Sequence, residues 1–364
     1  MGHRLGDRRV SAQFPKTLIW GLALSMLAAL FAYSENFLSR RAFAAAGGGA
    51  GAMDQGCDRA CLDGIVNQYL VALVAHDPSQ LYLNKGWKAT ETGQAVRLGE
   101  GMWKSVDQIG IYQLHFADPD AAEAGILALT DEHGVPGVLA LRLKMHSRKI
   151  SEVESIVVRQ DIPGQGGNLT TSTMFAVNPL TPIDRKWFIL PDPLFPDGVA
   201  HAQRTPRDRM IAAADAYFDG IERSSSAGVP IDGSCIRRDN GVQTTNNPGV
   251  SLIDPAFPSF KVFGLDCAAQ LDSRFYSVIS KVRARRYPIV DDERGIVFAI
   301  VLFDHPGDKL TVEVPGVGAV AVAPTYRVPS SYLVAAVFKI LSGKIVRIEL
   351  LERVVPYGMP SGWN

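Results

Sequence analysis

Hydrophobic and polar positions alternate along several stretches of the chain, and one alternating phrase occurs twice. LKMHSRKISEVE begins at Leu143, and FKILSGKIVRIE begins at Phe338. Each phrase contains two alternating runs around a short turn, and a period of two is typical of half-buried antiparallel strands. Each phrase therefore predicts a β-hairpin. Glu154 and Glu349 occupy equivalent places in them. Because Val153 takes the opposite face, Glu154 faces either water or a concave pocket, and we expect water.

Helical spacing of apolar residues precedes each predicted hairpin. We expect helices over 61–77 and 209–221, and FADP (116–119) and FDHP (303–306) lie at similar relative positions in the two halves. Each helix gathers apolar residues on one face, namely Ile65, Tyr69, Ala72 and Leu73 in the first and Met210, Ala213, Ala214, Tyr217 and Ile221 in the second. Three landmarks in the same order predict a duplicated α+β unit. Chance is the alternative, because the shared phrase is a simple one.

The second half contains two further predicted elements. RFYSVISKVRARRYPIVDDERG, which begins at Arg274, predicts a helix carrying Tyr276, Arg283 and Arg286, followed by a strand and an acidic turn. GIVFAIVLFDHPG predicts a buried strand that ends at Asp304 and His305.

The composition is that of a globular protein: 47% of the 364 residues are hydrophobic and 20% are charged. Basic and acidic side chains number 37 each, which gives a formal charge of zero. Proteins that bind nucleic acid need a basic surface, and no basic run with interleaved aromatic residues is present. We therefore expect no nucleic-acid partner.

The N-terminal region is expected to direct export. Basic residues precede TLIWGLALSMLAALFAY at 17–33, an uncharged run that is typical of a signal peptide or a single-pass membrane anchor. Ala42-Phe43-Ala44 fits a cleavage site, and 44–52 is expected to be a flexible tether. Export to the periplasm or the outside is the prediction, with cleavage and anchoring both open.

The domain organisation follows from these patterns. Residues 1–56 form the signal or anchor and its tether, 57–180 the first domain and 207–364 the second. The proline-rich stretch 181–206 is expected to be a linker that packs against the domains. An irregular stretch at 246–258 is either a lid or a long loop.

Four cysteines agree with export. Three pairings are possible, and the local one, Cys57 with Cys61 and Cys235 with Cys267, is the simplest. Free buried thiols and metal ligation are the alternatives, but no CxxC or HxxxH spacing supports a metal site. We expect two disulfides and no metal.

A helix followed by a curved sheet resembles the NTF2-like (SnoaL-like) cone. The chain is also similar, from about Cys57 to Trp363, to a family of exported fungal and bacterial proteins known as a domain of unknown function. The stretches that carry this resemblance are TETGQAVRLGEGMW, RRDNG, RRYPIVDDERGIV, FDHPG and the terminal PYGMPSGW. It implies an α+β fold of two tandem NTF2-like cones, each with helices packed on a curved antiparallel sheet. It implies no particular catalytic residues.

The candidate catalytic residues lie in the second half. A histidine beside a carboxylate at a strand end can move a proton, which singles out His305 with Asp304. The polar loop after Cys235 and the apolar face of the second helix supply the rest, namely Arg238, Asp239 and Tyr217. Each also has a structural interpretation: a polar turn for Asp304–His305, an ion pair for Arg238 and Asp239, and a core tyrosine for Tyr217.

Further residues are candidates for binding within a pocket. The set is Tyr276 and Arg286 in the second half and His76, Asp77, Trp103 and Tyr112 in the first. His76 and Asp77 are equally well explained as the end of a helix before Pro78. No GxSxG, Walker, GxGxxG or HExxH motif is present, so serine hydrolysis, nucleotide binding and zinc chemistry lack support.

Two functions remain open. The first is a cofactor-independent lyase, isomerase or hydratase that acts by general acid–base catalysis on a small, mostly apolar organic molecule in an NTF2-like pocket. The second is an exported module that binds a small ligand or a partner without turnover.

Overall fold

The structure is a computed structural model that describes residues 56–159, 190–248, 262–322 and 324–363. These residues fall within one compact unit, Asp54–Asn364. The expected signal or anchor at 17–33, the first part of the linker and most of the stretch at 246–258 lie outside the described residues. Within those ranges, no helix has the length and apolar character that a membrane span requires.

The first half consists of one helix and a six-stranded sheet. The side chain of Asp58 accepts a hydrogen bond from the Cys61 backbone and so caps the helix. The strand order is β2-β1-β6-β5-β4-β3, with β1 and β6 parallel and the other neighbours antiparallel. The elements are α2 (Arg59–Val74), η2 (Pro78–Gln80), β1 (Leu83–Glu91), β2 (Gln94–Ala95), η3 (Gly101–Lys104), β3 (Val106–Asp118), β4 (Glu123–Glu132), β5 (Val135–His146) and β6 (Lys149–Arg159).

The second half repeats this plan. Its sheet has the order β8-β7-β14-β13-β10-β9, again with one parallel pair, β7 with β14. A separate hairpin, β11 with β12, is added after β10. The elements are η4 (His201–Gln203), α4 (Arg207–Arg223), β7 (Ile231–Asp239), β8 (Val242–Gln243), α5 (Cys267–Asp272), η6 (Phe275–Val278), β9 (Lys281–Asp291), β10 (Ile296–His305), β11 (Thr311–Val314), β12 (Gly318–Ala321), η7 (Pro324–Arg327), β13 (Ser330–Leu341) and β14 (Lys344–Val355).

The two predicted hairpins are equivalent in detail. Lys144 pairs with Glu152 and Lys339 pairs with Arg347, and each hairpin has a register shift immediately after that lysine. The fold is therefore α+β, mostly sheet, with the same order of strands in both halves. The duplication expected from the sequence is present in the topology.

Two details of the sequence-based prediction are wrong. Phe116 lies in β3 but Phe303 lies in β10, so the two motifs do not correspond; the counterpart of Asp118 is Asp291, at the end of β9. A short polar stretch that ends in proline follows many strands and does not identify a particular one. Arg283 and Arg286 lie on β9 and not on a helix. The helical part of this stretch is limited to the short η6.

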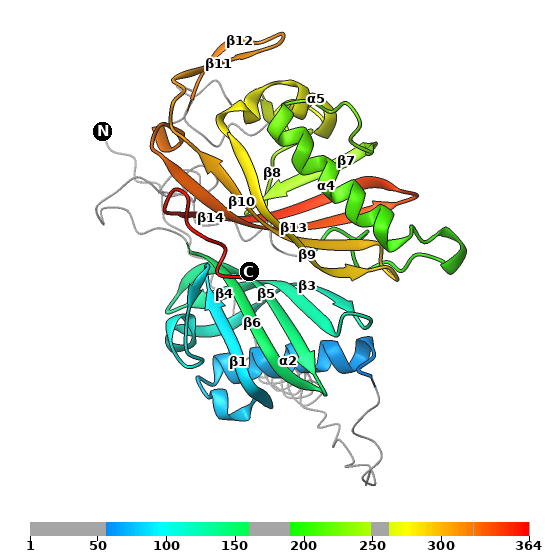
Figure 1. Cartoon of the computed structure of the whole chain (residues 1–364), viewed down its shortest axis with the longest axis vertical. Coiled ribbons are helices and arrows are strands. Elements are labelled where there is room, and N and C mark those ends of the chain that lie inside the picture. Colours follow the sequence, from blue (N-terminus) through cyan, green and yellow to red (C-terminus); the bar gives the residue numbers. More distant parts are fainter. Residues whose placement is uncertain (1–55, 160–189, 249–261, 323, 364) are drawn as a thin grey trace, which may run out of the picture. The chain divides into compact units, whose positions relative to one another are not determined.

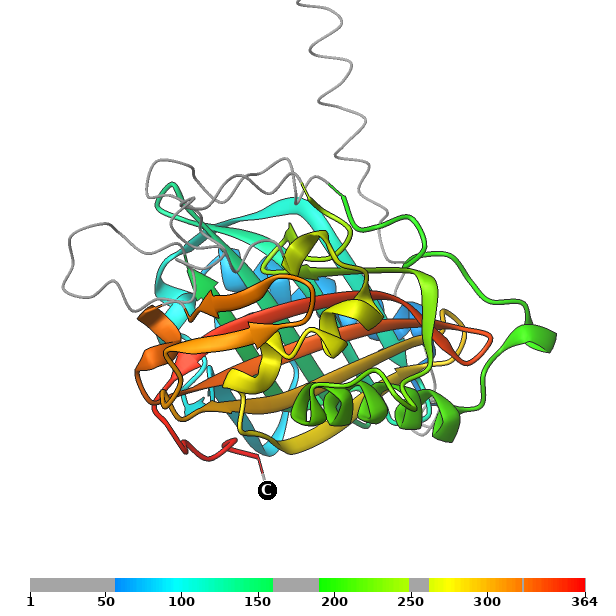
Figure 2. The same cartoon turned by 90° about the horizontal axis from the view of Figure 1, so that it is seen from above.

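Each sheet has a helix on one face and the other sheet on the opposite face. Figure 1 shows α2 against the first sheet and α4 with α5 against the second. Seen from above, α4 lies along the β9 side of its sheet (Figure 2). We call the two faces of a sheet its helix side and its sheet side. The space between the sheets is filled by a core that includes Phe116, Val138, Phe298 and Leu351.

Charged side chains join the two sheets around this core. Arg207 donates to both oxygens of Asp118, and Arg59 donates to both oxygens of Asp291. Glu154 accepts from Arg142 Nε at 2.9 Å and from Arg286 Nη2, in the other half, at 2.5 Å. Glu154 is 2% exposed, so the expectation that it faces water is wrong. The second sheet covers it, which no local pattern indicates.

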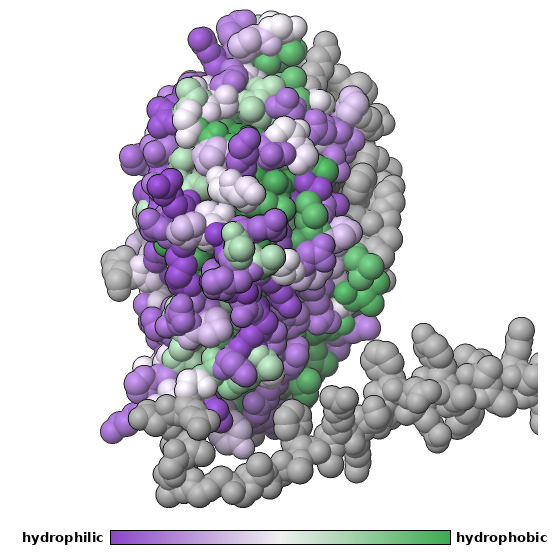
Figure 3. Space-filling model, turned by 90° about the vertical axis from the view of Figure 1, so that its right-hand side faces the viewer, coloured by the Kyte–Doolittle hydropathy of each residue, from purple (hydrophilic) through white to green (hydrophobic). Residues whose placement is uncertain are grey.

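Both predicted disulfides are present, Cys57–Cys61 and Cys235–Cys267. Two disulfides are consistent with an exported protein. The face shown in Figure 3 is mostly hydrophilic, with small apolar patches among the polar side chains.

Candidate functional site

A buried polar cluster lies on the helix side of the second sheet. Alternation along β7 places Cys235, Arg237 and Asp239 on this side. Arg237 Nε donates to Asp239 Oδ1 at 2.7 Å, and Nη1 donates to Tyr217 Oη at 3.2 Å and to the hydroxyl of Tyr276. Strand β7, helix α4 and η6 therefore each contribute one group to the arginine.

Glu352 completes the cluster from β14. Its Oε1 lies 3.9 Å from Arg237 Nη2. Asp239, which is closer to the arginine, also accepts a hydrogen bond from Thr244 Oγ1 at 2.8 Å. Burial, reinforced by the charge of Asp239, raises the pKa of Glu352 to about 8 against the opposing effect of Arg237. Burial also raises the pKa of Asp239, again opposed by Arg237. Because Asp239 has the shorter contact with the arginine, we assign the anion to Asp239 and the retained proton to Glu352.

A second layer of polar groups holds this cluster in place. Tyr276 donates to Gln270 Oε1 at 2.5 Å, and Gln270 Nε2 donates to the Thr244 carbonyl at 2.5 Å. The Cys235–Cys267 disulfide joins β7 to the first residue of α5, which carries Gln270. We call Arg237, Asp239, Glu352, Tyr217 and Tyr276 the Arg237 cluster.

His305 lies on the same side of the sheet, among aromatic rings. Its ring centroid is 5.0 Å from that of Tyr326 and 4.4 Å from that of Tyr332. Its Nδ1 makes no hydrogen bond within the part of the chain that the structure describes. Burial lowers the pKa of His305 to about 3, against the opposing effects of the Phe303 backbone and Asp304. The imidazole is therefore neutral, and a weak base, near pH 7.

Asp304 does not hold His305 as predicted. Consecutive residues of a strand point to opposite faces, and the Asp304 carboxylate accepts from Arg283 Nε at 2.6 Å and from Ser331 Oγ at 2.5 Å. Both carboxylate oxygens of Asp304 are therefore hydrogen-bonded to groups other than the imidazole of His305.

Arg238 also points away from the Arg237 cluster. It donates from Nη1 to Glu349 Oε1 at 3.1 Å, on the sheet side. Burial raises the pKa of Glu349 to about 7, against the effect of Arg238. Of the five candidate catalytic residues, Tyr217, Asp239 and His305 thus share the helix side, whereas Arg238 and Asp304 do not. Their catalytic roles stay predictions.

The second half matches a recognised family. A domain of unknown function, DUF8021, is found at residues 203–351. A comparison of the chain with curated proteins gives no match. The DUF8021 match begins just before α4 and includes Arg237, Asp239 and His305, but it ends one residue before Glu352. The first half lies outside the match.

Most of the residues expected to bind within a pocket are dispersed, although His76 Nδ1 lies 2.5 Å from the Trp103 carbonyl oxygen. Tyr276 belongs to the Arg237 cluster, whereas Arg286 and Tyr112 lie between the sheets. Trp103 is in the first core, where its Nε1 donates to Tyr69 Oη at 3.1 Å. His76 and Asp77 lie at the end of α2, where Asp77 caps η2. These contacts support the interpretation of His76 and Asp77 as the end of a helix before Pro78.

The first half provides a direct comparison with the DUF8021 region. Tyr69 and Tyr217 are counterparts, since each lies ten residues after the arginine that begins its helix (59 to 69 and 207 to 217). Strand register matches Arg237 with Ala89 and Glu352 with Val157. Both first-half residues are buried in an apolar core. The fold therefore does not require charged groups at these two positions.

Neither Arg237 nor Glu352 is among the candidates predicted from the sequence. Arg237 was visible only as one of two adjacent arginines, and alternation decides which of the pair lies beside Asp239. Glu352 was hidden in ELLERVV, an ordinary end to an amphipathic strand. Only its position in the repeat distinguishes Glu352, because the residue at the equivalent position of the first half, Val157, is apolar.

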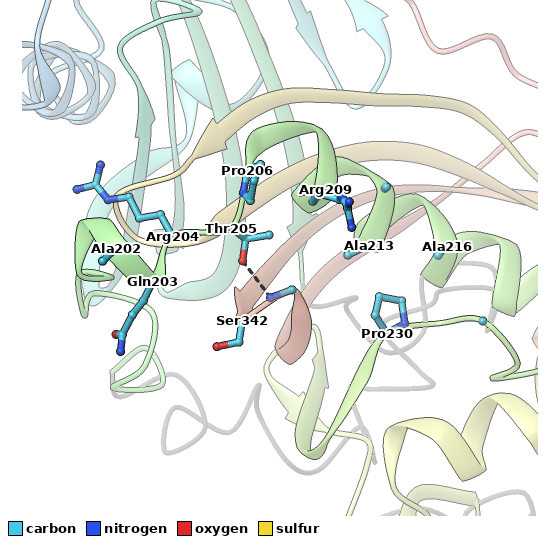
Figure 4. A pocket seen from close by; sticks show the side chains of 13 residues that line it. Ala202, Gln203, Arg204, Thr205, Pro206, Arg209, Ala213, Ala216, Pro230 and Ser342 are labelled. Atoms are coloured by element: carbon cyan, nitrogen blue, oxygen red, sulfur yellow. Dashed lines mark hydrogen bonds between the residues drawn. The ribbon is translucent and has the colours of Figure 1, made fainter.

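A separate cavity of about 590 Å³ lies near the start of α4. Figure 4 shows Arg204 and Thr205 on one side of it and Ala213 and Ala216 along the helix, facing Pro230. Thr205 Oγ1 accepts from the Gly343 backbone at 3.0 Å and fixes the β13–β14 turn. None of the candidate catalytic residues lines this cavity. Across the described ranges, no group of three or more His, Cys, Asp or Glu side chains is placed to hold a metal ion.

Proposed function

We propose that the second half binds a small, mostly apolar organic molecule on its helix side and moves a proton on it without a cofactor. The reaction class is that of a lyase, isomerase or hydratase, and the two halves are tandem NTF2-like cones. The chain would work outside the cytoplasm, released or anchored through residues 17–33. The buried Arg237 cluster is the observation that carries the proposal.

The Arg237 cluster buries charged groups, which costs free energy. Arg237, Asp239 and Glu352 are 3%, 2% and 5% exposed. Removing several ionisable groups from water costs several kcal/mol for each ion, and pairing often does no more than offset that cost. The first half keeps the same strand order with Ala89 and Val157 as the counterparts of Arg237 and Glu352, and with Glu91 as the counterpart of Asp239. A buried arginine and glutamate that the first half does without are typical of a functional site.

The chemical roles follow from charge and pKa. A general acid or base works best when its pKa lies near the working pH, and Glu352 meets this condition. Arg237, with the hydroxyls of Tyr217 and Tyr276 at its side, supplies positive charge and donors for an oxygen that becomes negative. Aromatic and aliphatic side chains around them, including Tyr332 and Phe303, suit an apolar substrate.

A proton-transfer assay tests the proposal. Cyclohexanone, 2-cyclohexenone and 3-pentanone in D2O, followed by proton NMR, report exchange of hydrogen next to a carbonyl. We expect the chain to accelerate exchange in at least one of them and Glu352→Gln to reduce the rate at least tenfold, since a positioned proton is worth about 10²–10⁴ in rate. Glu100→Gln, an exposed site in the first half, is the control. Equal exchange rates for Glu352→Gln and the unmodified chain would show that Glu352 does not transfer the proton.

A binding module without turnover is the second candidate. The packing of His305 against Tyr326, in a stacked pair, and against Tyr332, in a tilted pair, favours it, because rings there fill the helix side. Mass spectrometry of small molecules that co-purify with the chain distinguishes the two. A retained ligand together with no exchange in any of the three ketones supports binding alone.

A further inference from the structure

A second cavity, of about 490 Å³, lies on the outer side of the first half. Helix α2 provides one wall and strand β3 the floor. The segment 190–196 and the β9–β10 turn close the other sides. This volume lies within the range of small-molecule sites and is far larger than one water requires, which is about 30 Å³.

Two polar atoms in its lining lack hydrogen bonds. Asp63 Oδ1 and His115 Nδ1 are both buried, and neither has a hydrogen-bond partner within the described ranges. They lie 3.9 Å apart, which is too far for a direct hydrogen bond. A buried polar atom without a partner costs about 1–3 kcal/mol. Two such atoms side by side in a cavity indicate a group that binds both.

The charge state of His115 defines what that group must be. Burial lowers the pKa of His115, against the effect of Asp63 and together with that of Arg294, so the imidazole is neutral near pH 7. A neutral imidazole offers one donor and one acceptor, while the Asp63 carboxylate only accepts. A single oxygen about 2.8 Å from each atom can span a separation of 3.9 Å. A hydroxyl group fits, because it donates to Asp63 while it accepts from His115.

The remaining lining extends this chemistry. Asn67, one turn after Asp63 on α2, and Gln113, two residues before His115 on β3, add amides that both donate and accept. Arg294 balances the charge of Asp63, so the lining carries no net charge that would select an ion over a neutral ligand. The rim is apolar and consists of Leu190, Pro191, Pro193 and Pro196. Several hydroxyls on a carbon ring match both the polar floor and this rim.

We propose that this cavity binds a neutral polyhydroxylated ring of the size of a monosaccharide, with one hydroxyl bridging Asp63 and His115. The site is distinct from the Arg237 cluster and does not depend on the function proposed for it.

The test is a titration of the full chain with D-glucose, D-galactose, D-mannose and myo-inositol, followed by saturation-transfer NMR. At least one of the four is expected to bind saturably. Asp63→Ala and His115→Phe are each expected to weaken that binding at least tenfold. The matched control is Asp107→Ala, because Asp107 and His133 form an exposed pair at 2.9 Å elsewhere in the same half. It is expected to leave binding unchanged.

A second readout needs no variant and so does not depend on folding of the substituted chains. The ring nitrogens of His115 are expected to shift in ¹⁵N spectra when the sugar is added, while those of His133 stay in place. Saturable binding that moves the His115 signals supports the proposal. Binding by none of the four compounds, or binding that leaves His115 unchanged, overturns it.

Discussion

Arg207 and Asp118 lie in different halves of the chain, and their Nη2–Oδ2 contact of 2.6 Å is the counterpart of the contact between Arg59 and Asp291. Each arginine begins its helix, and each aspartate ends an edge strand of the other half, β3 for Asp118 and β9 for Asp291. The exchange is reciprocal at the backbone too, since Val290 N donates to Asp118 and Ala117 N donates to Asp291. The duplicated unit thus holds its two copies together with one repeated contact.

Asp118→Asn should lower the free energy of unfolding by about 2 kcal/mol, because hydrogen bonds to charged groups contribute about 1.5–3 kcal/mol. Asp118 is 1% exposed, so water does not replace the lost contact. Urea unfolding measures the change. Asp120→Asn, at an exposed position in the same turn, is the control and should have little effect. Equal losses for the two variants would show that the contact does not stabilise the pairing of the halves.

Glu349 and Glu352 should each make stability fall as pH rises between about 5 and 8, while His305, whose pKa burial lowers from 6.5 to about 3, acts in the opposite direction below about pH 6.5. The pKa values of Glu349 and Glu352 are raised from the usual 4.5 to about 7 and about 8. Folded chains therefore keep protons that unfolded chains release, so this stabilisation is complete below pH 4.5 and is lost as pH passes the folded values. Each such carboxyl contributes a slope of at most about 1.4 kcal/mol per pH unit.

Denaturant unfolding of Glu352→Gln across pH 5–8 checks this dependence. The variant should show a shallower decline than the unmodified chain, because glutamine does not titrate. Glu100→Gln should retain the full decline. An unchanged slope in Glu352→Gln would mean that Glu352 is ionised in the folded state.

The C-terminal PYGMPSGW stretch contacts the first half of the chain through Trp363. Its ring lies 4.0 Å from Lys88 Nζ and 4.7 Å from the guanidinium carbon of Arg142, and its Nε1 donates to Thr90 Oγ1 at 2.8 Å. The stretch after β14 therefore reaches the first half and covers the buried charges around Glu154. Trp363→Ala should cost about 3 kcal/mol of unfolding free energy, by analogy with buried large-to-small changes.

Tyr357→Ala is the matched control for that change. Tyr357 belongs to the same stretch but is 50% exposed. Thermal unfolding should show a clear decrease in Tm for Trp363→Ala and a small one for Tyr357→Ala. A Tm for Trp363→Ala within a degree of the unmodified chain would exclude a stabilising role for the ring.

The features predicted correctly from the sequence are those with local causes. Alternation and a turn specify the β5–β6 and β13–β14 hairpins, and close cysteines specify the disulfides. The burial of Glu154 was missed because it depends on Arg286, which comes from a distant strand. The parallel pairing of β1 with β6 is likewise non-local. The sequence predicts a helix over the first part of β9, where arginines interrupt the alternation, and these arginines bind acids of both halves.

The candidate site was anticipated in part. Asp239, Tyr217, Tyr276 and His305 were selected from residue type and do share one side of a sheet. Glu352 was not selected, because a glutamate near the end of a strand is usually solvated. Only comparison with Val157 in the equivalent strand distinguishes it, and that requires the register of both halves.

The most direct test asks whether the Arg237 cluster serves function and not the fold. The triple variant Arg237→Leu, Asp239→Leu and Glu352→Val removes the three charged groups. Ala89 and Val157 are the apolar counterparts of Arg237 and Glu352 in the first half, and Asp239 is replaced with them because it would otherwise be left without its arginine. Replacing a buried charge cluster by apolar residues is often neutral or stabilising. We therefore predict an unfolding free energy within about 2 kcal/mol of the unmodified chain, together with loss of ketone exchange. A loss of several kcal/mol more than this would show that the cluster is structural and would contradict the account.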